Sequence, residues 1–212
     1  MTSPVATVFI VDDDAAVRKA LTRLLQTAGV PACSFPSPQT FLEQHDAATP
    51  GCVVLDVAMP GLGGLDVQRA LSASGCGRPI IFLTGRGDIP TSVRAMKAGA
   101  VDFLTKPVKD EDLLAAVHNA IEIDRLARQA EAERRAIRQR LATLTPRERE
   151  VLERVVAGRL NKQIAADLGT VEKTIKVHRA RVMEKMEVRS LAELVHLTER
   201  LGILPGDRPI TA

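Results

Sequence analysis

Short apolar runs alternate with stretches of helical spacing through the first half of the chain. Between the runs, apolar residues recur every three or four positions, and Asp14 and Gly29 are placed to start and end one helix. Strands that alternate with helices predict a mostly parallel sheet covered by helices on both faces. Five runs have the length of buried strands: 6–11, 31–35, 52–57, 79–84 and 100–105.

The middle of the chain has the pattern of one long helix. The sequence has no Gly or Pro between Pro107 and Pro146, so we expect a helix of about thirty residues there. Its apolar positions indicate either a solvated linker helix with many charge pairs or a weak coiled-coil seam, and both interpretations stay open. These positions are Ile123, Leu126, Ala130, Ile137, Leu141 and Leu144.

Two helix starts are marked in the last third of the chain. In LTPRERE, Thr145 is the expected N-cap, Pro146 takes the first helical position, and Glu148 completes a capping box. Ser190 and Glu193 form a second expected capping box before the final helix. We expect the region between these two helix starts to be mainly helical.

A helix-turn-helix order lies between the two caps. We expect a short helix over 161–168, a turn at Gly169 and a longer helix over 171–186. On the longer helix, one face should pack on the core: Val171, Ile175, Val182 and Met186. The opposite face carries Lys173, Lys176, Val177 and Ala180. A basic helix face in this context favours nucleic acid over a merely solvated surface.

Composition narrows the class of protein. The 212 residues suffice for two domains, and the formal charge of +3 arises entirely in 145–212, with 13 basic against 10 acidic residues. Only 2% of residues are aromatic, which argues against a base-stacking platform for single strands or RNA. Three cysteines without CxxC spacing argue against zinc and disulfides, and no apolar run is long enough to span a membrane. We expect a cytoplasmic protein with no membrane partner.

The ends of the predicted strands carry candidate chemistry. Asp12–Asp14 follow the first strand, Asp56 ends the third, Thr84 the fourth, and Lys106 follows the fifth. In parallel sheets, ligands bind outside these carboxyl ends. Carboxylates about 4 Å apart repel by roughly 4 kcal/mol at an effective dielectric of about 20, so the cluster needs a cation. Oxygen ligands indicate Mg²⁺, and Asp56 is a candidate nucleophile for a phosphoryl group.

Several motifs together resemble a known family. IVDDDAAVRKAL, LDVAMPGLGGLDV and LTGRGDIPTSVRAMKAGAVDFLTKP, followed by the helix-turn-helix segment, are similar to two-component response regulators of the FixJ type. The resemblance implies a flavodoxin-like (βα)5 receiver with a parallel five-stranded sheet, a long linker helix and a four-helix LuxR-type helix-turn-helix domain. The expected division is receiver 1–122, helical linker 123–142, DNA-binding domain 143–206 and flexible tail 207–212.

The resemblance implies roles for the receiver residues. Asp56 would accept phosphate from a sensor histidine kinase, and Lys106 would pair with the phosphoryl oxygens across a cis bond to Pro107. Thr84 and Phe103 would move together as the switch on phosphorylation. The Mg²⁺ ligands would be Asp12, Asp13, Asp56 and the backbone carbonyl of Ala58.

An aspartate-based phosphohydrolase is an alternative that uses the same nucleophile. That class carries a second Asp two residues after the first, and this position is Ala58 here. We therefore expect a regulator rather than an enzyme, with residual autophosphatase activity only. A receiver whose output domain binds another protein is the second alternative.

The resemblance also implies that the longer helix enters the major groove of promoter DNA. Phosphorylation would favour a homodimer through the fourth helix, fifth strand and fifth helix, and RNA polymerase is a further expected partner. One departure concerns Val171, where the family often has a capping Ser, which leaves Thr170 as a poorer cap. The implied DNA contacts are Asn161, Lys162, Lys173, Thr174, Lys176, Val177, Arg179, Ala180 and Arg181.

Overall fold

The computed structural model describes residues 5–85 and 89–202. The chain forms two compact units that divide between Arg128 and Gln129. The expected tail, 207–212, lies outside the described residues. Across the described ranges, none of the helices combines the length and the apolar character that crossing a membrane requires.

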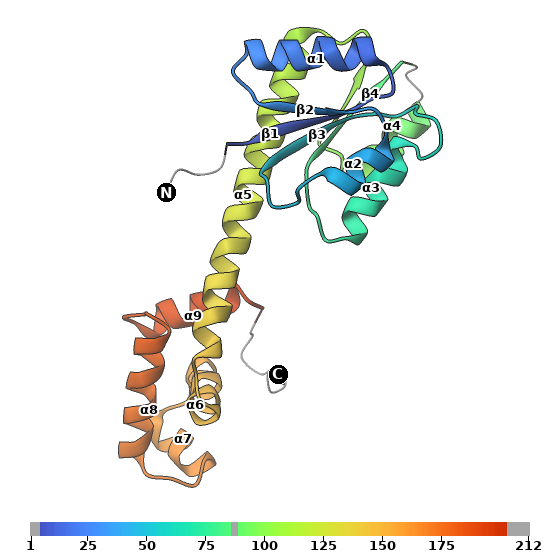
Figure 1. Cartoon of the computed structure of the whole chain (residues 1–212). Coiled ribbons are helices and arrows are strands. Elements are labelled where there is room, and N and C mark those ends of the chain that lie inside the picture. The colour runs from blue at the N-terminus through green and yellow to red at the C-terminus, as the bar shows by residue number, and fades with distance from the viewer. Residues whose placement is uncertain (1–4, 86–88, 203–212) are drawn as a thin grey trace. The chain divides into compact units, whose positions relative to one another are not determined.

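A parallel sheet forms the centre of the first unit (Figure 1). Its strand order is β2-β1-β3-β4-β5, which is the flavodoxin-like order, so the predicted fold class is confirmed. Each strand begins and ends within two residues of a predicted apolar run. The strands are β1 (Thr7–Val11), β2 (Ala32–Phe35), β3 (Gly51–Asp56), β4 (Ile80–Thr84) and β5 (Asp102–Thr105).

Helices cover both faces of this sheet, because alternate side chains of each strand point to opposite faces. Val8 and Ile10 of β1 pack with α1 and α5, whereas Phe9 and Val11 pack with residues of α2, α3 and α4. Figure 1 shows α1 on one side of the sheet and α2 and α3 on the other. The bounds are α1 (Ala15–Thr27), α2 (Pro38–Gln44), α3 (Gly64–Ala73), α4 (Ile89–Lys97) and α5 (Asp110–Ala142).

The long helix α5 has 33 residues, and the prediction of a helix of about thirty residues is confirmed. Its last apolar positions, Ile137 and Leu141, are buried in the core of the second unit together with Leu144. Ile123 and Leu126 are exposed. Half of the apolar positions that could form a coiled-coil seam are thus packed within the chain itself, which favours the linker interpretation.

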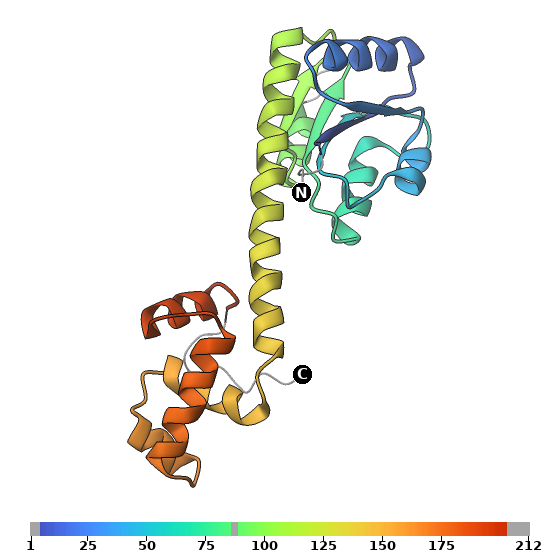
Figure 2. The same cartoon turned by 60° about the vertical axis from the view of Figure 1, so that its left-hand side comes forward.

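In the described part of the second unit, further helices pack around a separate core (Figure 2). Both predicted N-caps are present: Thr145 Oγ1 accepts from Glu148 N, and Ser190 Oγ accepts from Glu193 N. The Glu148 carboxylate returns to Thr145 N, whereas that of Glu193 reaches Arg189 N instead of the cap residue. The helices are α6 (Pro146–Val156), α7 (Asn161–Asp167), α8 (Glu172–Lys185) and α9 (Leu191–Glu199).

Candidate functional site

Three carboxylates meet at the carboxyl edge of the sheet. Asp12 and Asp13 directly follow β1 and Asp56 ends β3, and the two strands pair in parallel with Val11 opposite Leu55. One oxygen from each carboxylate lies within 4.8 Å of the others. Asp12 and Asp56 are only 1% and 5% exposed, whereas Asp13 is exposed. The register of the sheet therefore assembles residues that are 44 positions apart in the sequence.

Lys106 enters this cluster from the end of β5. Its Nζ lies 2.6 Å from Asp12 Oδ2 and 3.1 Å from Asp56 Oδ1. Lys106 N donates to Thr84 O at 2.7 Å, and the Lys106–Pro107 peptide bond is cis, as expected. Burial acts to lower the pKa of Lys106, but its hydrogen bonds to Asp12 and Asp56 outweigh burial and raise the pKa. The ammonium group is therefore firmly charged at neutral pH.

The donor set fits a divalent cation of the Mg²⁺ type. The three carboxylates supply only hard oxygen ligands. Within the described residues, the ion pairs of the cluster set one positive charge, that of Lys106, against three carboxylates. A further cation would relieve the remaining repulsion.

Local sequence explains how the backbone reaches this geometry. Asp14 caps α1, as predicted, by accepting from Ala16 N at 2.7 Å, and Asp14 N donates to Asp12 Oδ1 at 2.9 Å. On the other side, Gly64 begins α3 against the end of β3. A Cβ atom there would lie 2.6 Å from Asp56 O, so only glycine allows the helix to start this close to the site.

The other predicted receiver residues lie around the cluster at different depths. Thr84 ends β4, the strand beside β3, and is 4% exposed. Ala58 is exposed, two residues after Asp56. Phe103 is half-buried and lies two residues before the end of β5, with its ring centroid 6.2 Å from that of Phe82.

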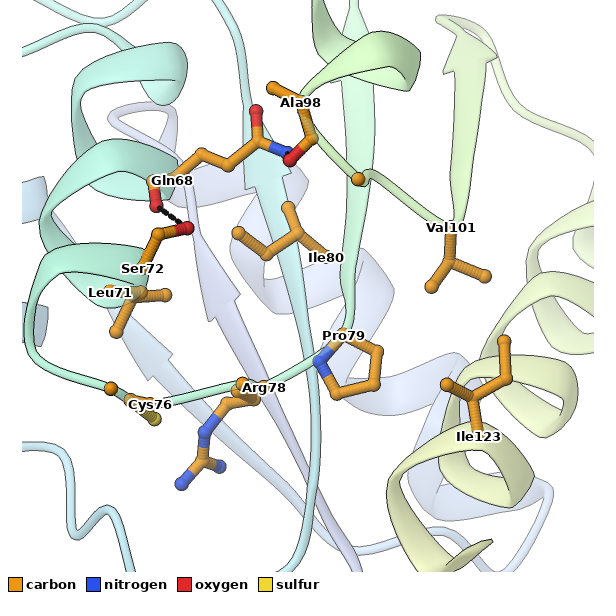
Figure 3. A pocket seen from close by; sticks show the side chains of 13 residues that line it. Gln68, Leu71, Ser72, Cys76, Arg78, Pro79, Ile80, Ala98, Val101 and Ile123 are labelled. Carbon is orange, nitrogen blue, oxygen red and sulfur yellow. Dashed lines mark hydrogen bonds between the residues drawn. The ribbon is translucent and has the colours of Figure 1, made fainter. Parts of the chain in front are cut away.

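A separate hollow of about 380 Å³ lies at the opposite, amino edge of the sheet (Figure 3). Its walls are mainly apolar, and in the figure the Arg78 guanidinium points away from Val101 and Ile123. The amide of Gln68 is turned to Ala98, whose carbonyl accepts from Gln68 Nε2 at 3.0 Å. Arg78 is thus the charged residue that lines this hollow, whereas the carboxylate cluster lies at the carboxyl edge of the sheet.

The second unit presents a helix-turn-helix surface. Ile175 and Val182 of α8, together with its C-cap residue Met186, are at most 1% exposed and pack in the core, as predicted. Arg179 and Thr174 are half-buried at the sides of the helix. The exposed residues of the opposite face are Lys173, Lys176, Val177, Ala180 and Arg181.

Val171 was assigned to the core face, and this assignment is wrong. Val171 is 64% exposed and is the N-cap of α8, with φ −99° and ψ 150°. Helical periodicity does not apply to a cap residue, because its backbone is extended. Val171 makes no side-chain cap bond to the described residues, so the expected weakness at the start of this helix is present.

Polar contacts organise the exposed face of the helix-turn-helix. Lys176 Nζ lies 3.3 Å from Glu172 Oε1 one turn earlier on α8. Arg179 Nη1 donates to Asn161 Oδ1 at 3.2 Å and so links α8 to the start of α7. Lys162, next to Asn161, is exposed. This hydrogen bond joins one predicted contact residue of α8 to one of α7.

The sequence interpretation missed two contacts. Glu148 was identified as a capping residue, but it also pairs with Lys185, with 2.6 Å between Lys185 Nζ and Glu148 Oε2. Arg18 donates to the carbonyl oxygens of Asp12 and Asp13. Arg18 stands one turn into the helix that follows the acidic turn, but its acceptors are backbone carbonyls, which a side-chain pattern does not mark. No local pattern marks the pairing of Glu148 with a residue 37 positions away.

Comparison with known proteins agrees with both units. Residues 8–118 match the response regulator receiver domain family, and residues 142–198 match the luxR family of bacterial regulatory proteins. The chain is 47% identical to nodulation protein W of Bradyrhizobium diazoefficiens, covering 93% of this chain and 87% of that protein. It is 45% identical to the transcriptional regulatory protein FixJ of the same organism, over 93% and 96%.

Solved structures agree as well. The structure of the response regulator StyR is similar with a TM-score of 0.84 and 46% identity, covering 92% of this chain and 99% of that one. The chain therefore belongs to the response regulator family. Within that family, it joins a receiver domain to a LuxR-type DNA-binding domain. It is a transcription regulator and not an enzyme, and the predicted family, fold and class of function are confirmed.

Proposed function

We propose that Asp56 accepts a phosphoryl group from a sensor histidine kinase and that this modification controls sequence-specific binding to promoter DNA. The observation that carries the proposal is the pair of buried carboxylates, Asp12 and Asp56, that share the Lys106 ammonium group at the carboxyl edge of the sheet. A buried carboxylate cluster with too few positive charges is costly for a purely structural site. It suits a site that receives a cation and a phosphoryl group.

The transfer step uses the carboxylate of Asp56 as nucleophile. One of its oxygens forms a bond to phosphorus while the bond from phosphorus to the kinase histidine nitrogen breaks, and the nitrogen leaves with the electron pair. Lys106 holds a phosphoryl oxygen and balances part of its charge. A bound Mg²⁺ would neutralise further phosphoryl charge, with Asp12, Asp13, Asp56 and the carbonyl of Ala58 as its proposed ligands.

Thr84 and Phe103 are the proposed switch residues. Thr84 lies at the end of β4 beside the strand that carries Asp56, where its hydroxyl could donate to a phosphoryl oxygen. Phe103 is half-buried on β5, so part of its ring is accessible from the surface. The face formed by α4, β5 and α5 is the proposed homodimer surface, and Val93 and Met96 of α4, each 45% exposed, support this assignment.

The helix α8 is the proposed reading element for double-stranded DNA. Its exposed basic face, opposite a fully buried core face, supports entry into the major groove. The proposed contacts to bases and phosphates are Lys173, Thr174, Lys176, Val177, Arg179, Ala180 and Arg181, with Asn161 and Lys162 at the backbone. A promoter-bound regulator of this kind would act on RNA polymerase in the cytoplasm.

The proposed division of the chain follows these roles. Residues 1–122 form the receiver, 123–142 the linker, 143–206 the DNA-binding domain and 207–212 the tail. The family matches over 8–118 and 142–198 support this division. The two compact units divide a few residues later than the proposed receiver boundary, after Arg128.

The test is phosphorylation with a small-molecule phosphodonor and Mg²⁺. We expect Asp56→Asn to abolish labelling, while Asp66→Asn, on α3, is labelled like the wild type. Equal labelling of wild type and Asp56→Asn would refute the receiver mechanism. The same samples serve for mobility shifts on selected genomic fragments. Phosphorylation should tighten binding of the wild type and leave Asp56→Asn unchanged.

Salt dependence separates DNA binding from the protein-binding alternative. Binding to promoter fragments should weaken steeply as salt rises. Lys162→Ala should lower the affinity for all sequences alike and reduce the salt slope by about one unit. An output domain that leaves DNA unshifted at low salt, with or without phosphorylation, would favour a protein partner instead.

A further inference from the structure

Arg18 lies one turn into α1, behind the acidic turn that joins β1 to this helix. Its Nη1 atom donates to Asp12 O at 2.8 Å and to Asp13 O at 3.0 Å. The guanidinium group thus bridges two successive peptide groups. Both acceptors are backbone carbonyls, so these contacts leave the carboxylate oxygens of Asp12 and Asp13 available.

This bridge constrains the backbone of the acidic turn. Two successive planar peptide groups that are held at their carbonyls fix φ and ψ of the residue between them, Asp13, and with them the direction of its Cα–Cβ bond. Asp12 has additional contacts, to Asp14 N and to Lys106 Nζ. The carboxylate of Asp13 is exposed, so the orientation of its backbone is the principal constraint on where it points.

We propose that Arg18 is a positioning residue for the cation site. By holding the carbonyls of the acidic turn, it aims the carboxylates of Asp12 and Asp13 at the point where the proposed function requires Mg²⁺. This inference rests on that proposed function. Arg18 acts through the backbone of the two aspartates and not as a ligand.

The direction of the change in Mg²⁺ affinity on removal of Arg18 separates a positioning role from the effect of its charge alone. As a nearby positive charge, Arg18 repels a divalent cation, and its removal would tighten binding by about two-fold across solvent. As a positioning residue, it aligns the ligands, and loss of such support typically weakens metal affinity by about ten-fold or more. The two effects have opposite directions, and the larger one is positioning.

The experiment is calorimetric titration of Mg²⁺ into the unphosphorylated full-length chain. We expect Arg18→Ala to raise the Kd for Mg²⁺ by about ten-fold. Arg18→Lys should have an intermediate Kd, because one ammonium group can serve only part of the bridge. Lys19→Ala is the matched control, since it removes an exposed positive charge from the next position of the same helix. Its Kd should stay within about two-fold of the wild type.

A second readout excludes a merely structural effect. In phosphodonor labelling, Arg18→Ala should need about ten-fold more Mg²⁺ for the half-maximal rate, while its rate at saturating Mg²⁺ stays near that of the wild type. Global destabilisation would instead lower the rate at every Mg²⁺ concentration and the melting temperature of the metal-free chain. Should Arg18→Ala fail to fold, Arg18→Lys must still bind Mg²⁺ more weakly than the wild type.

The outcomes distinguish this inference from the proposed function. If wild type is labelled and Asp56→Asn is not, while Arg18→Ala binds Mg²⁺ as tightly as the wild type or more tightly, the positioning role is wrong and the receiver mechanism stands. If Asp56→Asn is labelled like the wild type, the proposed function itself fails.

Discussion

Each of the two units contains a lysine that pairs with a buried carboxylate, and the two sites are balanced differently. In the DNA-binding unit, Lys185 Nζ lies 2.6 Å from Glu148 Oε2 and 3.1 Å from Thr143 O. Glu148 also accepts from Thr145 N at 2.9 Å. One positive charge faces one negative charge, and both have further hydrogen-bond partners.

The receiver site has the opposite balance. Lys106 faces Asp12 and Asp56 at once, and Asp13 adds a third carboxylate to the cluster. A satisfied buried pair stabilises a fold, whereas an excess of like charge in a cleft marks a site for a ligand. The comparison teaches that the net charge of a buried ionic cluster indicates whether the cluster stabilises the fold or binds a ligand.

The largest effect is expected from breaking the balanced pair of Lys185 and Glu148. Glu148→Gln keeps an oxygen that can accept from Thr145 N, but it removes the charge opposite Lys185. We expect a loss of about 2 kcal/mol in the free energy of unfolding of the DNA-binding unit, because Lys185 keeps partial access to water. Calorimetric unfolding of the full chain measures this. Glu150→Gln, which removes a half-buried charge that pairs with Arg147 near the same helix start, should cost under about 0.5 kcal/mol.

Acid should break the same pair in the wild type. The hydrogen bond from Lys185, together with that from Thr145 N, lowers the pKa of Glu148 to about 2 from an ordinary value of 4.5. Because the folded pKa is the lower one, the stabilisation is fully present above pH 4.5 and is lost as the pH falls toward 2.

The measurement is the melting temperature of the DNA-binding unit between pH 6 and pH 2.5. The wild type should lose stability more steeply below pH 4.5 than Glu148→Gln, which has no carboxyl group to protonate at this position. Parallel pH profiles for the two proteins would show that Glu148 keeps its ordinary pKa.

The two lysine sites also differ in how far the sequence predicts them. Asp12 and Lys106 are 94 positions apart, yet both follow predicted strands of a parallel sheet, and the carboxyl ends of such strands meet at one edge. No comparable rule brings Lys185 to Glu148, because the crossing of two helices depends on side-chain packing that spacing alone does not specify. The topology of the sheet, and not proximity in sequence, made the receiver site predictable.

The remaining differences arise at element ends. Strands, caps and the three buried core positions of α8 follow from periodicity and local hydrogen bonding. The position of Val171 does not follow from periodicity, because the residue precedes the first residue of α8 and is therefore outside the helical pattern. Arg18 contacts backbone carbonyls, which carry no residue-type signal, so a side-chain pattern alone does not identify its partners.

A smaller effect should appear when the receiver cluster loses one charge. Asp13→Asn relieves repulsion between carboxylates, so we expect the metal-free receiver to become more stable, by about 1 kcal/mol or less. Mg²⁺ should reverse the order, because it stabilises the wild type by binding to the folded state and binds the variant more weakly. Thermal unfolding with and without Mg²⁺ tests both statements.

Glu43→Gln is the control for this prediction. Glu43 is an exposed acidic residue of α2, outside the carboxylate cluster, so its substitution should change neither the metal-free stability nor the response to Mg²⁺. A metal-free Asp13→Asn receiver that is less stable than the wild type would mean that Asp13 is structurally satisfied, as Glu148 is.

The same comparison applies to two valines of α8. Val182 is 1% exposed and belongs to the core, whereas Val177 is 47% exposed although it lies on an ordered helix. An apolar side chain held away from the core suits contact with a thymine methyl in the major groove. Val177→Ala should therefore weaken preference for one base position by about 1 kcal/mol or less and leave the melting temperature unchanged.

Val182→Ala should do the reverse, with a stability loss of about 2 kcal/mol and an unchanged base preference in the fraction that stays folded. Competition binding on a set of single-base variants, with melting curves of the same samples, measures both quantities. If Val177→Ala lowers stability and leaves base preference intact, α8 does not read DNA through this residue.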